Sequence, residues 1–84
     1  MSVTNLQGFT HTVAMEVWRS GLNGRSVAEI VKATNLPEYR VILALNFLRE
    51  AEGYHECVYG TSEPSIWVTA ANYGYLKFVK GVAA

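Results

Sequence analysis

The most constraining feature of this chain is a set of helix-boundary signals between Ser26 and Gly53. Glu29 follows Ser26 by three positions, which is the pattern of a capping box at a helix start. Pro37 suits the first turn of the next helix, because its missing amide hydrogen costs nothing there. Gly53 favours the left-handed conformation that ends a helix. The segment therefore predicts two consecutive helices, the first ending near Thr34 and the second at Gly53.

Changes in apolar periodicity predict the elements on either side. Apolar residues recur at spacings of three and four over Asn5–Arg19, which indicates an amphipathic helix. After Gly53 the period changes to two, and residues 60–64 are rich in turn formers, so we expect a hairpin ending at Val68. Thr69 is placed to cap a last helix reaching about Val79. The predicted fold is mainly α with a small β-hairpin, in the order three helices, two strands, one helix.

The third predicted helix has one face that is expected to pack on the core and one that is expected to face outward. The positions expected to face the core are Val41, Ala44, Leu45 and Leu48. The positions expected to face outward are Pro37, Glu38, Tyr39, Ile42, Leu43 and Asn46, with Phe47 beside them. Four inner positions suffice for the core, so the outer face carries surplus apolar side chains. A register shifted by one position would instead bury some of Ile42, Leu43 and Phe47.

Size, charge and cysteine content narrow the class of protein. With 84 residues we expect one domain spanning 1–84. Seven basic and seven acidic residues give a formal net charge of zero, whereas phosphate binding favours a basic domain. The single cysteine, Cys57, excludes an intramolecular disulfide. The N-terminus lacks the pattern of a signal peptide, and no apolar run suffices for a membrane span, so we expect a cytoplasmic protein without membrane contact.

His55 and Cys57 form the one pair that suggests metal or nucleophilic chemistry. A structural zinc site needs four ligands, and His11 is the only further candidate besides carboxylates. A nucleophilic cysteine would also need an orienting residue and an oxyanion donor. We therefore predict no enzyme, no metal site and no cofactor. If Ile66 and Val68 point inward, alternation along the second strand places Trp67 outward beside His55 and Tyr59, in either a binding patch or a cross-strand cluster.

The segment EIVKATNLPEYRVILALNFLREAEGY resembles the pattern of the winged helix-turn-helix family. Val31 stands where the family has a small buried residue in its second helix. Asn35 follows at the left-handed turn, a conformation that asparagine tolerates. The residues IWVT, ending at Thr69, resemble the strand that closes the wing and leads into the last helix. The resemblance covers nearly the whole chain and implies a single winged helix domain.

This resemblance implies a small DNA-binding transcriptional regulator whose third helix enters the major groove. The implied DNA contacts comprise base contacts from Tyr39, Arg40 and Asn46, backbone contacts from Arg25, Ser26 and Lys32, and wing-tip contacts from Thr61 and Ser62. Family members that read DNA carry polar or basic residues on the outer face of this helix, because base edges present hydrogen-bonding groups. Here that face is largely apolar, and Glu38 would repel phosphates.

The alternative function is recognition of a protein. Contiguous exposed apolar surface usually marks an interface. The side chains that would dock on a protein or on a second copy of the chain are Tyr39, Leu43, Phe47 and Trp67. A homodimer is also expected through the terminal helices, because their aromatic side chains exceed what one small core can cover. These aromatic residues are Trp18, Tyr73, Tyr75 and Phe78.

Overall fold

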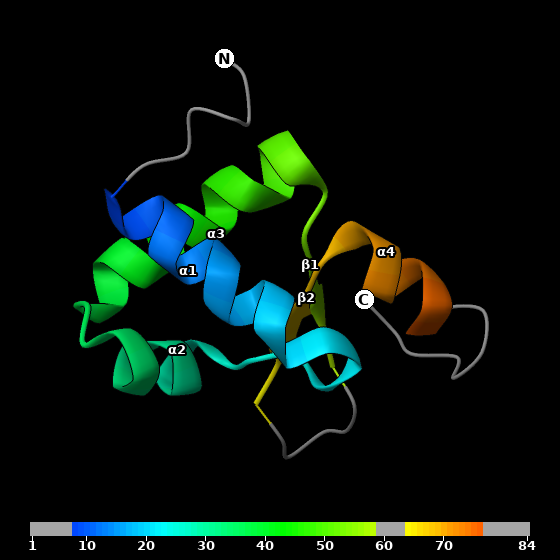
Figure 1. Cartoon of the computed structure of the whole chain (residues 1–84), viewed down its shortest axis with the longest axis horizontal. Coiled ribbons are helices and arrows are strands. Elements are labelled where there is room, and N and C mark those ends of the chain that lie inside the picture. Colours follow the sequence, from blue (N-terminus) through cyan, green and yellow to red (C-terminus); the bar gives the residue numbers. More distant parts are fainter. Residues whose placement is uncertain (1–7, 59–63, 77–84) are drawn as a thin grey trace.

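The computed structural model describes residues 8–58 and 64–76. Its elements in chain order are α1 (Gly8–Ser20), η2 (Gly21–Asn23), α2 (Val27–Thr34), α3 (Glu38–Glu52), β1 (His55–Cys57), β2 (Ile66–Val68) and α4 (Ala70–Tyr75) (Figure 1). The described chain is thus mainly helical with a two-stranded antiparallel hairpin, as the sequence predicts. The predicted extensions of the first helix before Gly8 and of the last helix beyond Leu76 lie outside the described residues.

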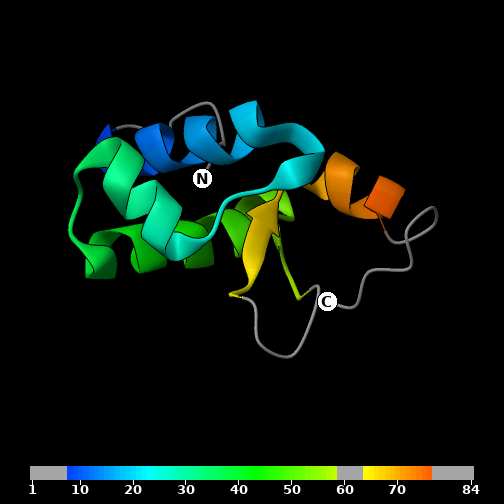
Figure 2. The same cartoon turned by 90° about the horizontal axis from the view of Figure 1, so that it is seen from below.

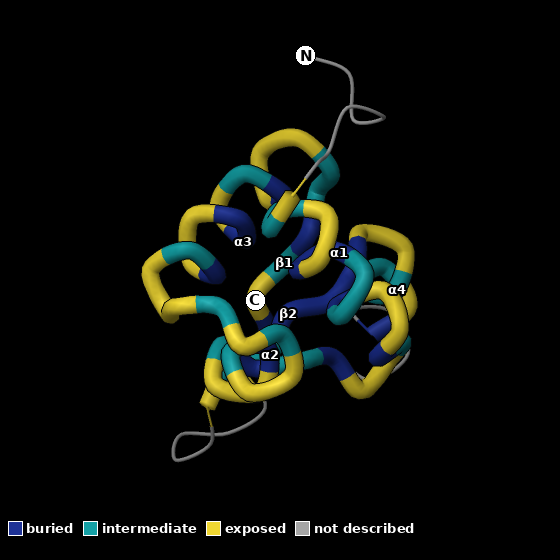
Figure 3. Tube along the Cα trace, turned by 60° about the vertical axis from the view of Figure 1, so that its left-hand side comes forward, coloured by how far each residue is buried: buried dark blue, intermediate teal, exposed yellow. Residues whose placement is uncertain are grey.

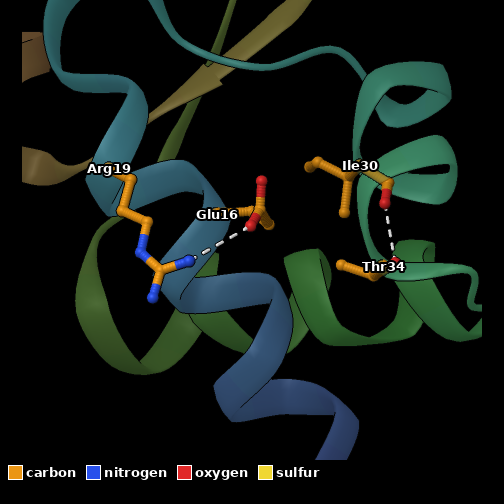
Figure 4. Close-up of polar contacts among 4 residues, drawn as sticks. All are labelled: Glu16, Arg19, Ile30 and Thr34. Carbon is orange, nitrogen blue, oxygen red and sulfur yellow. Dashed lines mark hydrogen bonds and ion pairs between the residues drawn. The ribbon is translucent and has the colours of Figure 1, made fainter.

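Both predicted ends of α2 are confirmed. The Ser26 hydroxyl accepts a hydrogen bond from the Glu29 amide, and the Glu29 carboxylate accepts one from the Ser26 amide. At the other end the Thr34 hydroxyl donates to the Ile30 carbonyl at 2.6 Å (Figure 4). Asn35 follows with φ of 61°, the left-handed conformation expected there. The prediction for Val31 was wrong in part, because Ile30 is the fully buried residue and Val31 packs only at the edge of the core.

The core lies between the first three helices, and the register predicted for α3 is confirmed. All four inner residues of α3 are buried. They meet Val13 and Val17 of α1 and Ile30 of α2 in one cluster. α1 lies on one side of this core and α3 on the other (Figure 2). Gly53 ends α3 with φ of 74°, and its amide donates to the Leu48 carbonyl.

The hairpin has an additional partner that the sequence did not predict. Glu56 of β1 lies opposite Trp67 of β2. Beyond β2, Arg25 forms an antiparallel bridge with Trp67, in which the Arg25 amide donates to the Trp67 carbonyl at 3.1 Å and the Trp67 amide donates to the Arg25 carbonyl at 2.7 Å. Arg25, two residues before α2, is therefore tied directly to the hairpin.

The outward orientation predicted for Trp67 was wrong. Its side chain is only 4% exposed and belongs to the core between the helices. The neighbouring Val68 is also buried, in a second cluster with Cys57 and Leu76. Burial does not alternate along β2, because both of its faces are covered, the Trp67 face by the helical core and the Val68 face by the region of α4. Trp67 is therefore not available to a partner on the surface of the isolated chain.

Candidate interaction surface on the third helix

The outward side of α3 carries a continuous apolar stripe. Tyr39 is 59% exposed, Ile42 41% and Leu43 58%, and Asn46 is exposed one turn further on. Their spacing of three, one and three residues places them on one side of the helix. We call these four residues the α3 face. In Figure 3 the exposed parts of α3 turn away from α1, and the buried parts turn toward it.

Phe47 does not belong to this face. It was expected to point outward, but it is only partly exposed. Phe47 follows the buried Ala44 by three positions, so it lies at the border between the inner and outer sides of α3. Of Leu43 and Phe47, only Leu43 therefore belongs to the exposed apolar surface.

Charged residues flank the α3 face near its two ends. Glu38 is exposed in the first turn of α3, and Arg49 is exposed in the last. The Arg49 guanidinium donates to the Asn46 side-chain oxygen at 3.1 Å and lies 5.8 Å from the centre of the Trp67 ring. An apolar centre is thus bounded by Glu38 at one end and by Arg49 and the exposed Glu50 at the other.

Arg40, one of the three residues predicted to contact bases, is engaged within the molecule. Its guanidinium carbon lies 4.9 Å from the centre of the Phe9 ring and 5.5 Å from that of Tyr39. Arginine is attracted to the electron-rich faces of such rings. Arg40 is only partly exposed, so its side chain joins α3 to α1 instead of extending freely into solvent.

The Ser26 groups predicted to contact phosphate at the start of α2 are also bonded within the molecule. Ser26 is buried, and its hydroxyl accepts a hydrogen bond from the Glu29 amide. The Glu29 carboxylate in turn accepts a hydrogen bond from the Ser26 amide at 2.9 Å. A carboxylate at a helix start takes the place that a phosphate would use. Arg25 is partly buried beside it, Lys32 is exposed on α2, and Thr61 and Ser62 lie outside the described residues.

A second group of apolar side chains is exposed around the end of α1. Trp18 is 64% exposed, and Leu22 and Tyr75 are also exposed. Beside Trp18, Arg19 forms an ion pair with Glu16 at 3.6 Å (Figure 4). Tyr73, which was expected to join a dimer contact, instead stacks on His55 within the chain. Phe78 lies outside the described residues, and the homodimer through these helices stays a prediction.

The surroundings of His55 and Cys57 indicate that both side chains contribute to packing. The His55 ring stacks on Tyr73 with a centroid separation of 3.8 Å. The Cys57 thiol is fully buried, and burial, with a smaller contribution from the Glu56 charge, raises its pKa. A raised pKa disfavours the reactive thiolate. Within residues 8–58 and 64–76 there is no group of three or more His, Cys, Asp or Glu side chains able to hold a metal ion.

Comparison with known proteins adds no assignment. No protein-family model, curated protein or solved structure matches this chain. In the part of the chain that the structure describes, no helix combines the length and apolar character needed to cross a membrane.

Proposed function

We propose that this chain is a winged helix domain that recognises a protein through the α3 face. The winged helix assignment is supported by the element order, the left-handed turn at Asn35 and the bridge between Arg25 and the hairpin. The observation that carries the protein-recognition role is the exposure of Tyr39, Ile42 and Leu43 in one stripe. Anchors at i, i+3 and i+4 are the pattern by which a helix docks into an apolar groove.

The electrostatics of the same surface favour protein over nucleic acid. A DNA-reading helix presents hydrogen-bonding side chains to base edges and basic side chains to phosphates. The centre of the α3 face offers aliphatic groups instead, and Glu38 stands at the end that would enter the groove. Arg40 is stacked on Phe9, and Ser26 is bonded to Glu29. The formal net charge of zero supplies no general attraction to DNA.

Site-specific photocrosslinking tests this function. A photoreactive amino acid at position 43 should give discrete protein adducts in cells that express the chain, because Leu43 lies at the centre of the proposed contact. The matched control places the same group at Lys32, which is exposed on α2 outside the α3 face. Equal adducts from both positions, or adducts to nucleic acid alone, would contradict protein recognition by α3.

DNA binding is the second candidate function, and one observation favours it. Tyr39 and Asn46 are exposed on α3 and carry hydrogen-bonding groups, and Lys32 is exposed on the preceding helix. In this proposal α3 enters the major groove as in a transcriptional regulator, with Lys32 on the backbone. Binding to random-sequence duplex should then fall linearly with the logarithm of salt concentration. Absence of binding at low salt would remove this candidate.

A further inference from the structure

We infer that the α3 face docks on the α3 face of a second copy of this chain, with the two helices antiparallel about a two-fold axis. This inference rests on the proposed function, since it names the protein that the face recognises. A two-fold interface uses the same patch on both subunits, so the patch must complement itself. The arrangement of apolar and charged residues along α3 meets this requirement.

The positions of the α3 face are symmetric about the centre of the face. The four residues of the α3 face have their midpoint between Ile42 and Leu43. When two antiparallel helices pair about that point, Ile42 lies against Leu43 of the second copy and Tyr39 lies against Asn46. Asn46 uses its side-chain oxygen for Arg49, which leaves its amide hydrogens for the Tyr39 hydroxyl across the interface. The apolar groups therefore meet in the middle, and the polar groups meet at the ends.

The flanking charges are complementary in the same arrangement. Glu38 and Arg49 are eleven positions apart, or about three helical turns, so they lie on the same flank of α3. A two-fold axis across antiparallel helices brings this flank of one copy beside the same flank of the other. Glu38 then lies about 3 Å along the helix axis from the Arg49 of the second copy. The contact is made twice by symmetry.

This charge pattern also selects the antiparallel orientation. In a parallel pair the two-fold axis runs along the helices and places the charged flanks of the two copies on opposite sides of the interface, so neither contact between Glu38 and Arg49 would form. The zero formal net charge adds no general repulsion between copies. A single helix pair buries less surface than a standard stable interface, so we expect micromolar rather than nanomolar affinity.

The test is sedimentation of charge-reversed chains, alone and mixed. Glu38→Arg places two positive charges together in each of the two symmetric contacts, and Arg49→Glu places two negative charges together there. Each variant alone should dimerise at least about tenfold more weakly than the unmodified chain, because two attractions become two repulsions. An equimolar mixture of the two variants should recover the dimer, since the two introduced charges then attract each other in one contact and the original pair is kept in the other. Lys32→Glu, a reversal outside the α3 face, should leave dimerisation unchanged.

Recovery in the mixture separates this contact from a folding defect, because mixing does not repair a chain that has lost its fold. Circular dichroism of each variant provides the second check. Monomer at all concentrations up to millimolar would overturn self-docking. So would a dimer that tolerates both reversals and is lost in Trp18→Ser, which would place the contact on the terminal helices. If the chain is monomeric but position 43 still crosslinks to another protein, only the self-docking fails and the proposed function stands.

Discussion

The Arg40 guanidinium carbon lies 4.9 Å from the centre of the Phe9 ring, so a cation on α3 is held against an aromatic ring on α1. The Tyr39 ring lies 5.5 Å from the same carbon. This arrangement gives Arg40 a structural role on the outside of the core. It also explains why the Arg40 side chain, of a type suited to contact guanine, does not extend from α3 into solvent.

We predict an energetic coupling between Arg40 and Phe9. In a double-mutant cycle of Arg40→Ala and Phe9→Ala, the two changes should couple by about 0.5–1 kcal/mol, the value typical of partly exposed cation–π pairs. The measurement is urea denaturation of the four chains. Arg19→Ala is the matched control, because Arg19 makes only a surface ion pair with Glu16. A vanishing coupling, together with lower DNA affinity in Arg40→Ala, would assign Arg40 to DNA instead.

Substitution by alanine should affect stability at Leu45 and dimerisation at Leu43. Leu45 is 1% exposed in the core, so Leu45→Ala should cost about 2–5 kcal/mol in the free energy of unfolding. Leu43 is mostly exposed, and Leu43→Ala should keep the melting temperature within a few degrees while weakening dimerisation. Thermal melts and sedimentation of both variants check this. A large loss of stability in Leu43→Ala would mean that the register of α3 is wrong.

Local signals made much of the helical framework predictable. The capping box at Ser26 and the left-handed Asn35 depend on residues a few positions apart, so sequence spacing specifies them. The inner stripe of α3 follows in the same way from helical periodicity. Burial of Trp67 could not be predicted from alternation, because the helical core covers the Trp67 side of β2 while a separate cluster with Leu76 buries Val68 on the other side. The bridge from Arg25 to Trp67 joins segments far apart in the sequence, and no local pattern encodes it.

The candidate site was predictable to a similar degree. The exposed stripe of Tyr39, Ile42 and Leu43 followed from the α3 register. The engagement of Arg40 by Phe9 did not, because residue type alone does not reveal which ring a side chain meets. Phe47 lies between the two sides of α3, where periodicity alone does not decide its burial.

Alkaline pH should destabilise the fold through Tyr54 and Cys57. Burial, with a smaller contribution from Glu52, raises the pKa of Tyr54 above its usual 10.0, and burial chiefly raises that of Cys57 above 9.0. A raised pKa in the folded state gives stability that is present below the unfolded value and is lost as pH rises through the folded value. The free energy of unfolding should therefore begin to fall above about pH 9.

Two variants separate these contributions to the pH dependence. Tyr54→Phe should flatten the decline above pH 10, and Cys57→Ala should flatten its onset nearer pH 9, after correction for their stability at pH 7. Urea denaturation at a series of pH values measures both slopes. If neither variant changes the slope, the two groups do not titrate differently in the folded and unfolded states.

Gly24 lies where the chain before α2 passes close to the hairpin. Its φ of 70° and ψ of −176° lie in a region that side chains rarely adopt. A Cβ atom at Gly24 would lie 2.6 Å from Ile66 Cδ1 and 2.9 Å from the Trp67 carbonyl oxygen. The second contact is with backbone, which cannot move without disturbing the bridge from Arg25 to Trp67. The position therefore combines backbone strain with a steric limit.

Gly21 provides the matched control for a substitution at Gly24. Gly21 also has a positive φ, of 57°, but a Cβ atom there would meet nothing within 4 Å. Gly21→Ala should therefore show the conformational cost alone, about 1 kcal/mol. Gly24→Ala should cost about 3 kcal/mol or more, because the clash adds to that strain. In Gly24→Ala the Arg25 and Trp67 amides, which donate across the bridge, should also exchange their hydrogens faster than in the unmodified chain. Equal costs for the two substitutions, with both amides still protected, would mean that the hairpin accommodates the methyl group and that the bridge does not depend on Gly24.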